Sequence, residues 1–432
     1  MCRSLIGCQR VEGATVTEAE RLLRQHFSRR AFLKRAGAGV LGLSFPALLP
    51  ACDDRSRTAS PARTPTPTPT ASPTPTPPPL TVDPSRPWWL QSDFAPVFDE
   101  RTDVDLLVRG AIPPELNGLY VRNSSNPQHA DSPHWFFGGY LHFFGYWFVP
   151  PYLTYHVADA DGRVINSQEI TVAGSTMMHS FAITERDAVF WELPVVFDLE
   201  SAVMGEIPFK WQPDYGARIG VMPLGGMAAD MRWVEIDPCY VFHPMNAHED
   251  DDRIVGDVMQ YDAAPLFPDP DGRPGDPTKA VAYLTRWTFD LNANTNGFKR
   301  EQIDDLAGEF PRFDERSAGL SYRHGFFAAS SDSRFVDQFD TLAHMDLKTN
   351  KRSAYQLPKG DVVSEPIFIP RKTDAREGDG YLLATIYRGA ERRSDLAVFD
   401  TVSLETGPIA LAELSHRVPF GFHGNWRPDV GN

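Results

Sequence analysis

The sequence from Thr341 to Leu357 reads TLAHMDLKTNKRSAYQL. It contains two short runs with apolar, β-branched and aromatic residues, Thr341–Leu347 and Ser353–Leu357. Between them, Lys348-Thr349-Asn350 has the polar, turn-forming composition that closes a hairpin. The stretch therefore predicts a strand, a tight turn and a second strand.

The same pattern recurs along most of the chain. Strand runs and turns alternate at residues 153–172 and 283–297, and again at residues 381–399. Helical periodicity is scarce from about residue 84 onward. This pattern predicts an all-β class, as a sandwich, barrel or propeller. Periodicity alone does not select the β-propeller, because no WD40-type repeat is visible.

The N-terminal region has a different composition. Ser28–Lys34 reads SRRAFLK, a twin-arginine export motif, and an apolar segment runs from Ala36 to Leu49. Leu49-Pro50-Ala51-Cys52 resembles a lipobox, which predicts cleavage before Cys52 and lipidation of its thiol. The alternative is a plain signal peptide followed by an unrelated cysteine. Residues 1–51 are thus expected to be a lipoprotein signal, with export by the twin-arginine route and anchoring on the extracytoplasmic membrane face.

Residues 52–84 are expected to be a linker. Nine prolines lie between residues 61 and 79, mostly in a Thr-Pro repeat that favours extended polyproline II conformation. A segment of this composition lacks the side chains for a core. The folded domain is therefore assigned to residues 85–432.

Charge narrows the classes of partner. The 432 residues carry a net charge of −15, divided into +6 for residues 1–63 and −21 for the rest. So acidic a domain repels a phosphate backbone, which argues against nucleic-acid binding. Of the four cysteines, only Cys52 and Cys239 would follow the cleavage site, so no disulfide framework is expected.

Three histidines are candidates for metal ligands. His179, His243 and His423 each lie among large apolar residues, in MMHSFA, VFHPMNA and FGFHGN. A buried neutral imidazole must satisfy both ring nitrogens, and a metal on Nε2 is one solution. Taken singly, each is more simply an ordinary core histidine. Their wide spacing excludes a local metal finger, so a shared site requires a fold that gathers distant strands.

Several motifs follow one another along the chain: LNGLYVRN (116–123), HWFFG (134–138), HFFGY (142–146), the segments 177–185 and 193–197, the segment 232–247, EFPR (309–312), EPIFIP (365–370) and the segment 417–426. In this order they resemble the carotenoid oxygenase family, which contains the carotenoid cleavage and lignostilbene dioxygenases. The resemblance runs from about Asp93 to the end.

The resemblance implies a seven-bladed β-propeller with Fe(II) on the central axis, held by four histidines. Three of these would be His179, His243 and His423, and Glu309 and Glu365 would accept the other ring N–H of the ligands. The implied activity is cleavage of a conjugated C=C bond by O₂ to give two carbonyl products. The implied substrates are carotenoids, apocarotenoids or stilbenes, held in a tunnel lined by aromatic residues.

The chain departs from the family pattern between Gly138 and Leu141. There the HWFFG and HFFGY motifs are almost contiguous, whereas the family has a long segment between them. About a hundred residues, or one to two blades, are expected to be missing together with the first histidine ligand. His129, His134, His142 and His248 are not expected to replace it. The acidic run 249–252 is expected to be a solvated loop, and Cys239 a small buried residue.

Two alternatives to the iron dioxygenase stay open. One is an inactive, shortened propeller that binds an apolar ligand or none. The other is a three-histidine metal hydrolase with an open site for water, although no matching general base is evident.

Overall fold

The computed structural model describes residues 101–124, 136–137, 140–159, 162–290, 297–332 and 338–428. The predicted export signal, the lipidation site Cys52 and the linker lie outside these residues, as does the junction at Gly138 and Gly139. No helix in the described part has the length and apolar character needed to span a membrane.

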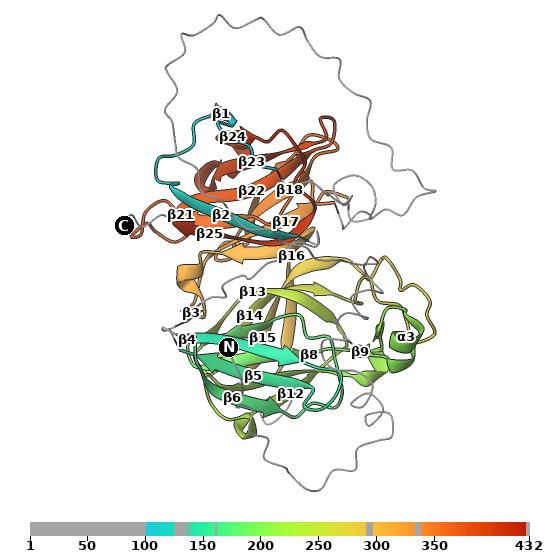
Figure 1. Ribbon diagram of the computed structural model, residues 1–432. Helices are drawn as coiled ribbons and strands as arrows, with labels where there is room; N and C mark the ends of the chain where they lie inside the picture. The colour runs from blue at the N-terminus through green and yellow to red at the C-terminus, as the bar shows by residue number, and fades with distance from the viewer. Residues whose placement is uncertain are drawn as a thin grey trace, which may run out of the picture. The chain divides into compact units, whose positions relative to one another are not determined.

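Among the described residues the fold is built almost wholly of antiparallel β-sheets, which confirms the predicted all-β class (Figure 1). The longest sheet has the order β13-β14-β15-β16-β17-β18-β19. Its strands are β13 (Tyr240–Asp250), β14 (Arg253–Tyr261), β15 (Ala282–Asp290), β16 (Lys299–Phe313), β17 (His324–Ser330), β18 (Thr341–Asp346) and β19 (Lys351–Gln356).

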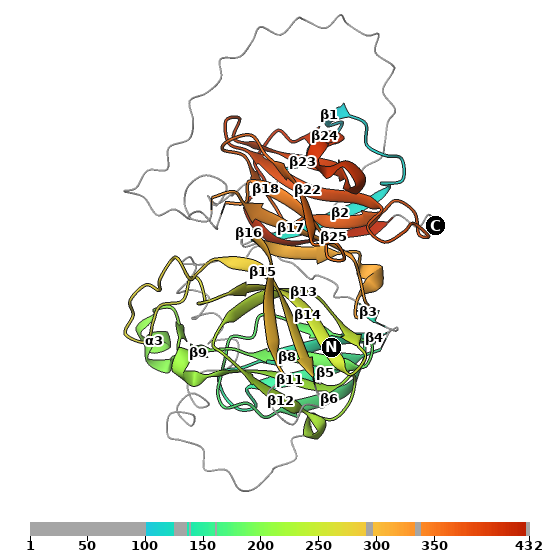
Figure 2. The ribbon, with the colours of Figure 1, turned by 180° about the vertical axis from the view of Figure 1, so that it is seen from behind.

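Strand β16 joins two halves of this sheet. Ala307 pairs with Tyr283 of β15 and also with Ser330 of β17, so the first half of β16 faces β15 and the second half faces β17. The sheet is therefore two four-stranded groups that share one long strand. In the view from behind, β16 can be followed between β15 and β17 (Figure 2). Four-stranded antiparallel units are the building blocks of propeller blades.

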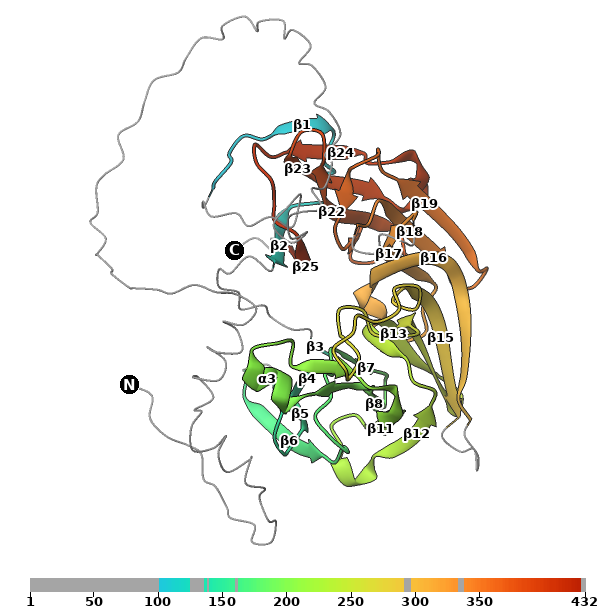
Figure 3. The same cartoon turned by 90° about the vertical axis from the view of Figure 1, so that its right-hand side faces the viewer.

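Two further sheets have four strands each. One has the order β3-β4-β5-β6 and the other β12-β11-β8-β7, and the neighbouring strands of the second can be followed in Figure 3. Their bounds are β3 (Phe136–Phe137), β4 (Tyr140–Tyr146), β5 (Leu153–Ala158) and β6 (Val164–Ile170), then β7 (Phe181–Ile183), β8 (Asp187–Glu192), β11 (Ala217–Pro223) and β12 (Arg232–Ile236).

The remaining sheets complete the framework. A six-stranded sheet has the path β1-β24-β23-β22-β20, with β21 also paired to β22, and two sheets have two strands, β9-β10 and β2-β25. Their bounds are β1 (Leu107–Gly110), β20 (Val362–Val363), β21 (Ile367–Pro370), β22 (Gly380–Arg388), β23 (Arg393–Asp400), β24 (Ala410–Glu413), β9 (Val195–Phe197), β10 (Phe209–Trp211), β2 (Gly118–Ser124) and β25 (Gly421–Pro428).

In the part of the chain that the structure describes, helices are few and short. The α-helix α3 (Leu199–Met204) is capped by the Asp198 side chain, which accepts a hydrogen bond from the Ser201 N–H. The 3₁₀ helices are η3 (Pro213–Tyr215), η4 (Ala228–Asp230), η5 (Glu315–Ser317) and η6 (Thr401–Thr406).

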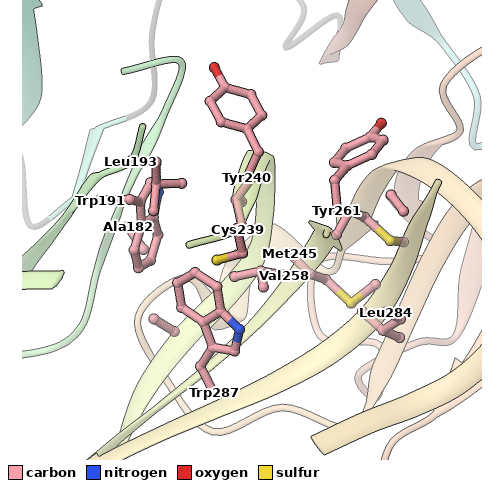
Figure 4. Packing of buried hydrophobic residues seen from close by; sticks show 14 of the residues in the cluster. Ala182, Trp191, Leu193, Cys239, Tyr240, Met245, Val258, Tyr261, Leu284 and Trp287 are labelled. Carbon is pink, nitrogen blue, oxygen red and sulfur yellow. The ribbon is translucent and has the colours of Figure 1, made fainter. Parts of the chain in front are cut away.

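The largest core cluster lies between the sheet of β7, β8 and β11 and the sheet that begins with β13. Figure 4 shows the Cys239 thiol packed near Trp287, with Trp191 on the neighbouring sheet. The two indole rings meet edge to face with centroids 5.6 Å apart. Cys239 is almost fully buried, as expected for a small core residue, and this burial raises its pKa to about 12. The core thus fixes the start of β13, which carries one candidate ligand.

Candidate metal centre

The three candidate histidines come together. Nε2 of His179 lies 3.2 Å from Nε2 of His243, which lies 3.3 Å from Nε2 of His423. Among the described residues these three form a group whose ligand atoms all lie within 4.8 Å of one another, with no fourth His, Cys, Asp or Glu. The predicted convergence of distant strands is therefore present.

Each of these side chains stands where regular strand pairing is interrupted. His243 lies at a register shift in β13 beside Pro244, which has no N–H to give to the ladder. His423 lies opposite a register shift in β2, and its own N–H donates to Oδ1 of Asn123 at 2.6 Å. His179 precedes β7 by two residues. Local departures from the ladder thus turn the three imidazoles away from the sheets and toward one point.

Two buried carboxylates hold two of the rings. Oε2 of Glu309 lies 2.6 Å from Nδ1 of His243 and also accepts the N–H of Phe310 at 2.7 Å. Oε1 of Glu365 lies 3.1 Å from Nδ1 of His423, and its Oε2 accepts the N–H of Gly424 at 2.7 Å. Only 6% of Glu309 and 2% of Glu365 is exposed. Each glutamate therefore contacts the Nδ1 side of one candidate ligand.

These contacts select one tautomer. A carboxylate accepts hydrogen bonds, so in the neutral ring Nδ1 of His243 and of His423 carries the proton. Nε2 of each neutral ring then carries a lone pair, and these two atoms lie 3.3 Å apart. Such an arrangement is unfavourable unless a cation lies between the nitrogens.

The spacing fits a transition-metal ion. Three imidazole nitrogens at about 2.1 Å from one ion, with right angles between the bonds, lie about 3.0 Å from one another. The observed separations of 3.2 and 3.3 Å are close to this value. Desolvation, and then the two neighbouring imidazoles, lower the pKa of His179 to about 3, so this ring is neutral at ordinary pH. The donor set is therefore the Nε2 atoms of three imidazoles.

Aromatic rings flank the histidines. Phe242 meets His179 edge to face with centroids 5.1 Å apart, and Phe310 lies 5.4 Å from His243 and 5.7 Å from His423. Phe310 has a φ of 54°, in the left-handed region, at the register shift between Glu309 and Arg312. Sequence reasoning placed Phe242 and Phe310 inside motifs but gave them no role, because no local pattern shows that they face the imidazoles.

The other candidates are elsewhere. Nδ1 of His142 lies 2.6 Å from the Tyr155 hydroxyl, and the His248 ring is near Tyr322. Glu249, in the acidic run, accepts the Arg186 N–H and contacts the Thr184 hydroxyl, so it is tied to the neighbouring turn. His129 and His134 lie outside the described residues. None of the described alternatives joins the three-histidine group.

Comparison with known proteins identifies the family. The family model described as RPE65, retinal pigment epithelial membrane protein, matches residues 138–428. The chain belongs to the carotenoid oxygenase (RPE65) family. Within this family, the chain is 34% identical over 287 residues to isoeugenol monooxygenase of Pseudomonas putida, covering 64% of this chain and 59% of that protein.

Other members of the carotenoid oxygenase family give similar results. Lignostilbene-alpha,beta-dioxygenase isozyme III of Sphingomonas paucimobilis is 34% identical, over 63% of this chain and 59% of its own. The crystal structure of lignostilbene dioxygenase from Pseudomonas brassicacearum matches with a TM-score of 0.64 and 34% identity, over 67% of this chain and 64% of that one. The chain thus spans about three fifths of the length of the curated relatives it matches first.

Proposed function

We propose that this protein is a non-haem iron dioxygenase that cleaves a conjugated C=C bond with O₂. The observation that carries the proposal is the meeting of three imidazoles through Nε2, two of them in contact with buried carboxylates through Nδ1. Bound Fe(II) would supply O₂ activation at coordination positions that the protein leaves open. His179, His243 and His423 would hold the ion.

The reaction balances without a further reductant. One C=C bond and the O=O bond break, two C=O bonds form, and each carbonyl product receives one oxygen atom. The polypeptide would hold the ligands neutral and oriented, since Glu309 and Glu365 keep the proton on Nδ1 and leave Nε2 free for the metal. No protein group needs to transfer a proton in the overall conversion.

The surroundings of the histidines suit an apolar conjugated substrate. From Phe242 beside His179, ring contacts continue through Phe267 and Phe209 to Phe197, with successive centroids 6.5, 6.4 and 5.7 Å apart. These four rings are only partly buried. The names of the relatives, isoeugenol monooxygenase and lignostilbene dioxygenase, support phenylpropenoid or stilbene substrates, and carotenoids or apocarotenoids are the other class.

The test is cleavage by Fe(II)-loaded protein of a hydroxylated stilbene and of an apocarotenal, with O₂ uptake and aldehyde formation measured together. Equal amounts of O₂ consumed and substrate cleaved are expected, and His243→Ala should abolish both. His142→Ala is the matched control and should keep activity, because His142 contacts Tyr155 instead of the cluster. Absence of cleavage by protein that binds iron would favour the inactive ligand-binding alternative, and O₂-independent hydrolysis would favour the hydrolase.

The location of the protein is a separate proposal that rests on sequence alone. We propose export by the twin-arginine route and anchoring through a lipid on Cys52, because the SRRAFLK motif and the lipobox-like LPAC lie in the expected order. Cys52→Ser should move the protein from the membrane fraction to the soluble fraction. Retention of the variant in the membrane would contradict the anchor.

A further inference from the structure

The two carboxylates behind the histidines are held in different ways. Glu309 contacts His243 and the Phe310 N–H through Oε2, while its buried Oε1 has no hydrogen-bond partner. Glu365 uses both oxygens, and its Oε1 also lies 3.5 Å from Nη1 of Arg312. Among the described residues, no arginine or lysine forms an ion pair with Glu309, and its ring partner is His243. The carboxylate that contacts His423 therefore has an arginine beside it, and the carboxylate that contacts His243 does not.

Arg312 connects two carboxylates. It follows the register shift in β16, and its Nη2 donates to Oε1 of Glu315 while its Nη1 faces Glu365. Only 15% of the Arg312 side chain and 24% of the Glu315 side chain is exposed. A planar guanidinium is suited to join two carboxylates at fixed angles. Arg312 is thus fixed from one side by Glu315 and presents its other edge to Glu365.

The charge of Arg312 opposes the cost of burying Glu365. A carboxylate that is only 2% exposed loses solvation, and the guanidinium of Arg312, 3.5 Å away, compensates for part of that loss. Glu365 is therefore held between Arg312, the His423 ring and the Gly424 N–H.

We propose that Arg312 is a positioning residue of the metal centre, which orients Glu365 and through it directs Nε2 of His423 toward His179 and His243. This inference rests on the proposed metal site and adds a residue that touches neither ligand nor metal. Its consequence is an asymmetric centre. Loss of Arg312 should disturb the contact between Glu365 and His423 and leave the contact between His243 and Glu309 intact.

The test is a double-mutant cycle on the full chain, with Co²⁺ as the probe of the site. Arg312→Met and Glu365→Gln should each weaken Co²⁺ binding by about 10- to 100-fold, the range seen when carboxylate partners of ligand histidines are lost. The double variant should bind no more weakly than Glu365→Gln alone, because Arg312 acts through Glu365. Arg312→Met should also alter the visible spectrum of bound Co²⁺.

Arg316→Met is the matched control. Arg316 lies four residues beyond Arg312 and pairs with buried Asp314. It has no contact with Glu365 among the interactions described, so its loss should leave Co²⁺ affinity unchanged. If Arg312→Met does not fold, Arg312→Lys decides the matter, because a single ammonium replaces the two-edged guanidinium. It should bind Co²⁺ several-fold more weakly than the unmodified chain.

Two results would overturn the proposal. One is a Co²⁺ affinity of Arg312→Met that equals that of the unmodified chain. If Arg312→Met does not fold, the same result for Arg312→Lys would overturn it. The other is a double variant whose loss equals the product of the two single losses, since that indicates independent effects. Failure of the unmodified chain to bind either Co²⁺ or Fe²⁺ is a different outcome, because it would contradict the proposed function itself.

Discussion

His243 and Glu309 are 66 positions apart in the chain, yet Nδ1 of the imidazole and Oε2 of the carboxylate lie 2.6 Å apart. The contact joins β13 to the second half of β16, within one seven-stranded sheet. It sets the tautomer of His243 and therefore decides which nitrogen faces the other two histidines.

Glu309→Gln tests this contact. Glutamine has nearly the same size but is a weaker acceptor, so the His243 tautomer is less firmly held and Fe²⁺ affinity should fall by about 10- to 100-fold. The measurement is an anaerobic Fe²⁺ titration. Glu301→Gln, an exposed position on the same strand, is the control and should bind as the unmodified chain does. Equal affinities for the two variants would contradict this role of Glu309.

At position 310, the glycine variant should be more stable than the alanine variant, which is the reverse of the usual order. Its φ of 54° costs a non-glycine residue about 1–2 kcal/mol, whereas glycine adopts it freely. Both Phe310→Gly and Phe310→Ala lose a ring that is 92% buried, since its exposure is 8%. Phe310→Gly should therefore be more stable than Phe310→Ala by about 1 kcal/mol. Urea denaturation measures this difference, and the usual order, with alanine more stable, would show that no strain resides there.

His344 should make stability depend on pH. Burial, and then the neighbouring His324, lower the pKa of His344 to about 4, from 6.5 in a free side chain. Between these two values the unfolded chain binds a proton that the folded protein does not, so stability should fall as pH decreases from 6.5 to 4. Within this range, each pH unit lowers the free energy of unfolding by at most about 1.4 kcal/mol.

His344→Phe removes this titration and leaves a ring to pack against Phe326, which stacks on His344 with centroids 5.0 Å apart. The variant should lose less stability than the unmodified chain between pH 6.5 and pH 5, as measured by denaturant midpoints. If the variant and the unmodified chain lose the same stability between pH 6.5 and pH 5, His344 does not titrate in this way.

Cys239 should be chemically silent in the folded protein. Burial raises its pKa to about 12, and the thiol is packed in the core near Trp287. In a chain carrying Ser at positions 2, 8 and 52, a thiol reagent should react only after denaturation. Rapid labelling of the native protein would contradict the packing of this core.

Much of the strand pattern could be predicted from local sequence. The hairpin expected at Thr341–Leu357 is β18 and β19, and the strand runs expected within residues 381–399 are β22 (Gly380–Arg388) and β23 (Arg393–Asp400). Alternating apolar residues and turn-forming residues are local signals, which is why these elements were predictable. The way in which β16 serves two groups of strands was not predicted, because pairing partners are not encoded in local composition.

The site was predictable only in part. The three histidines stood out by their apolar neighbours, but their convergence and the roles of Glu309 and Glu365 required the family resemblance. Arg312 lies in the EFPR motif, yet nothing local indicates that its partner is Glu365, 53 positions further on. Contacts of this kind depend on register shifts and strand order, which follow from tertiary packing.

Metal content tests the central claim most directly. The unmodified chain, reconstituted anaerobically with Fe²⁺ and freed of excess ion, should hold about one iron per polypeptide, as expected for one cluster of three imidazoles. His179→Ala, His243→Ala and His423→Ala should each lose it, and His142→Ala should retain it. A folded, monodisperse unmodified chain without stoichiometric iron would contradict the account.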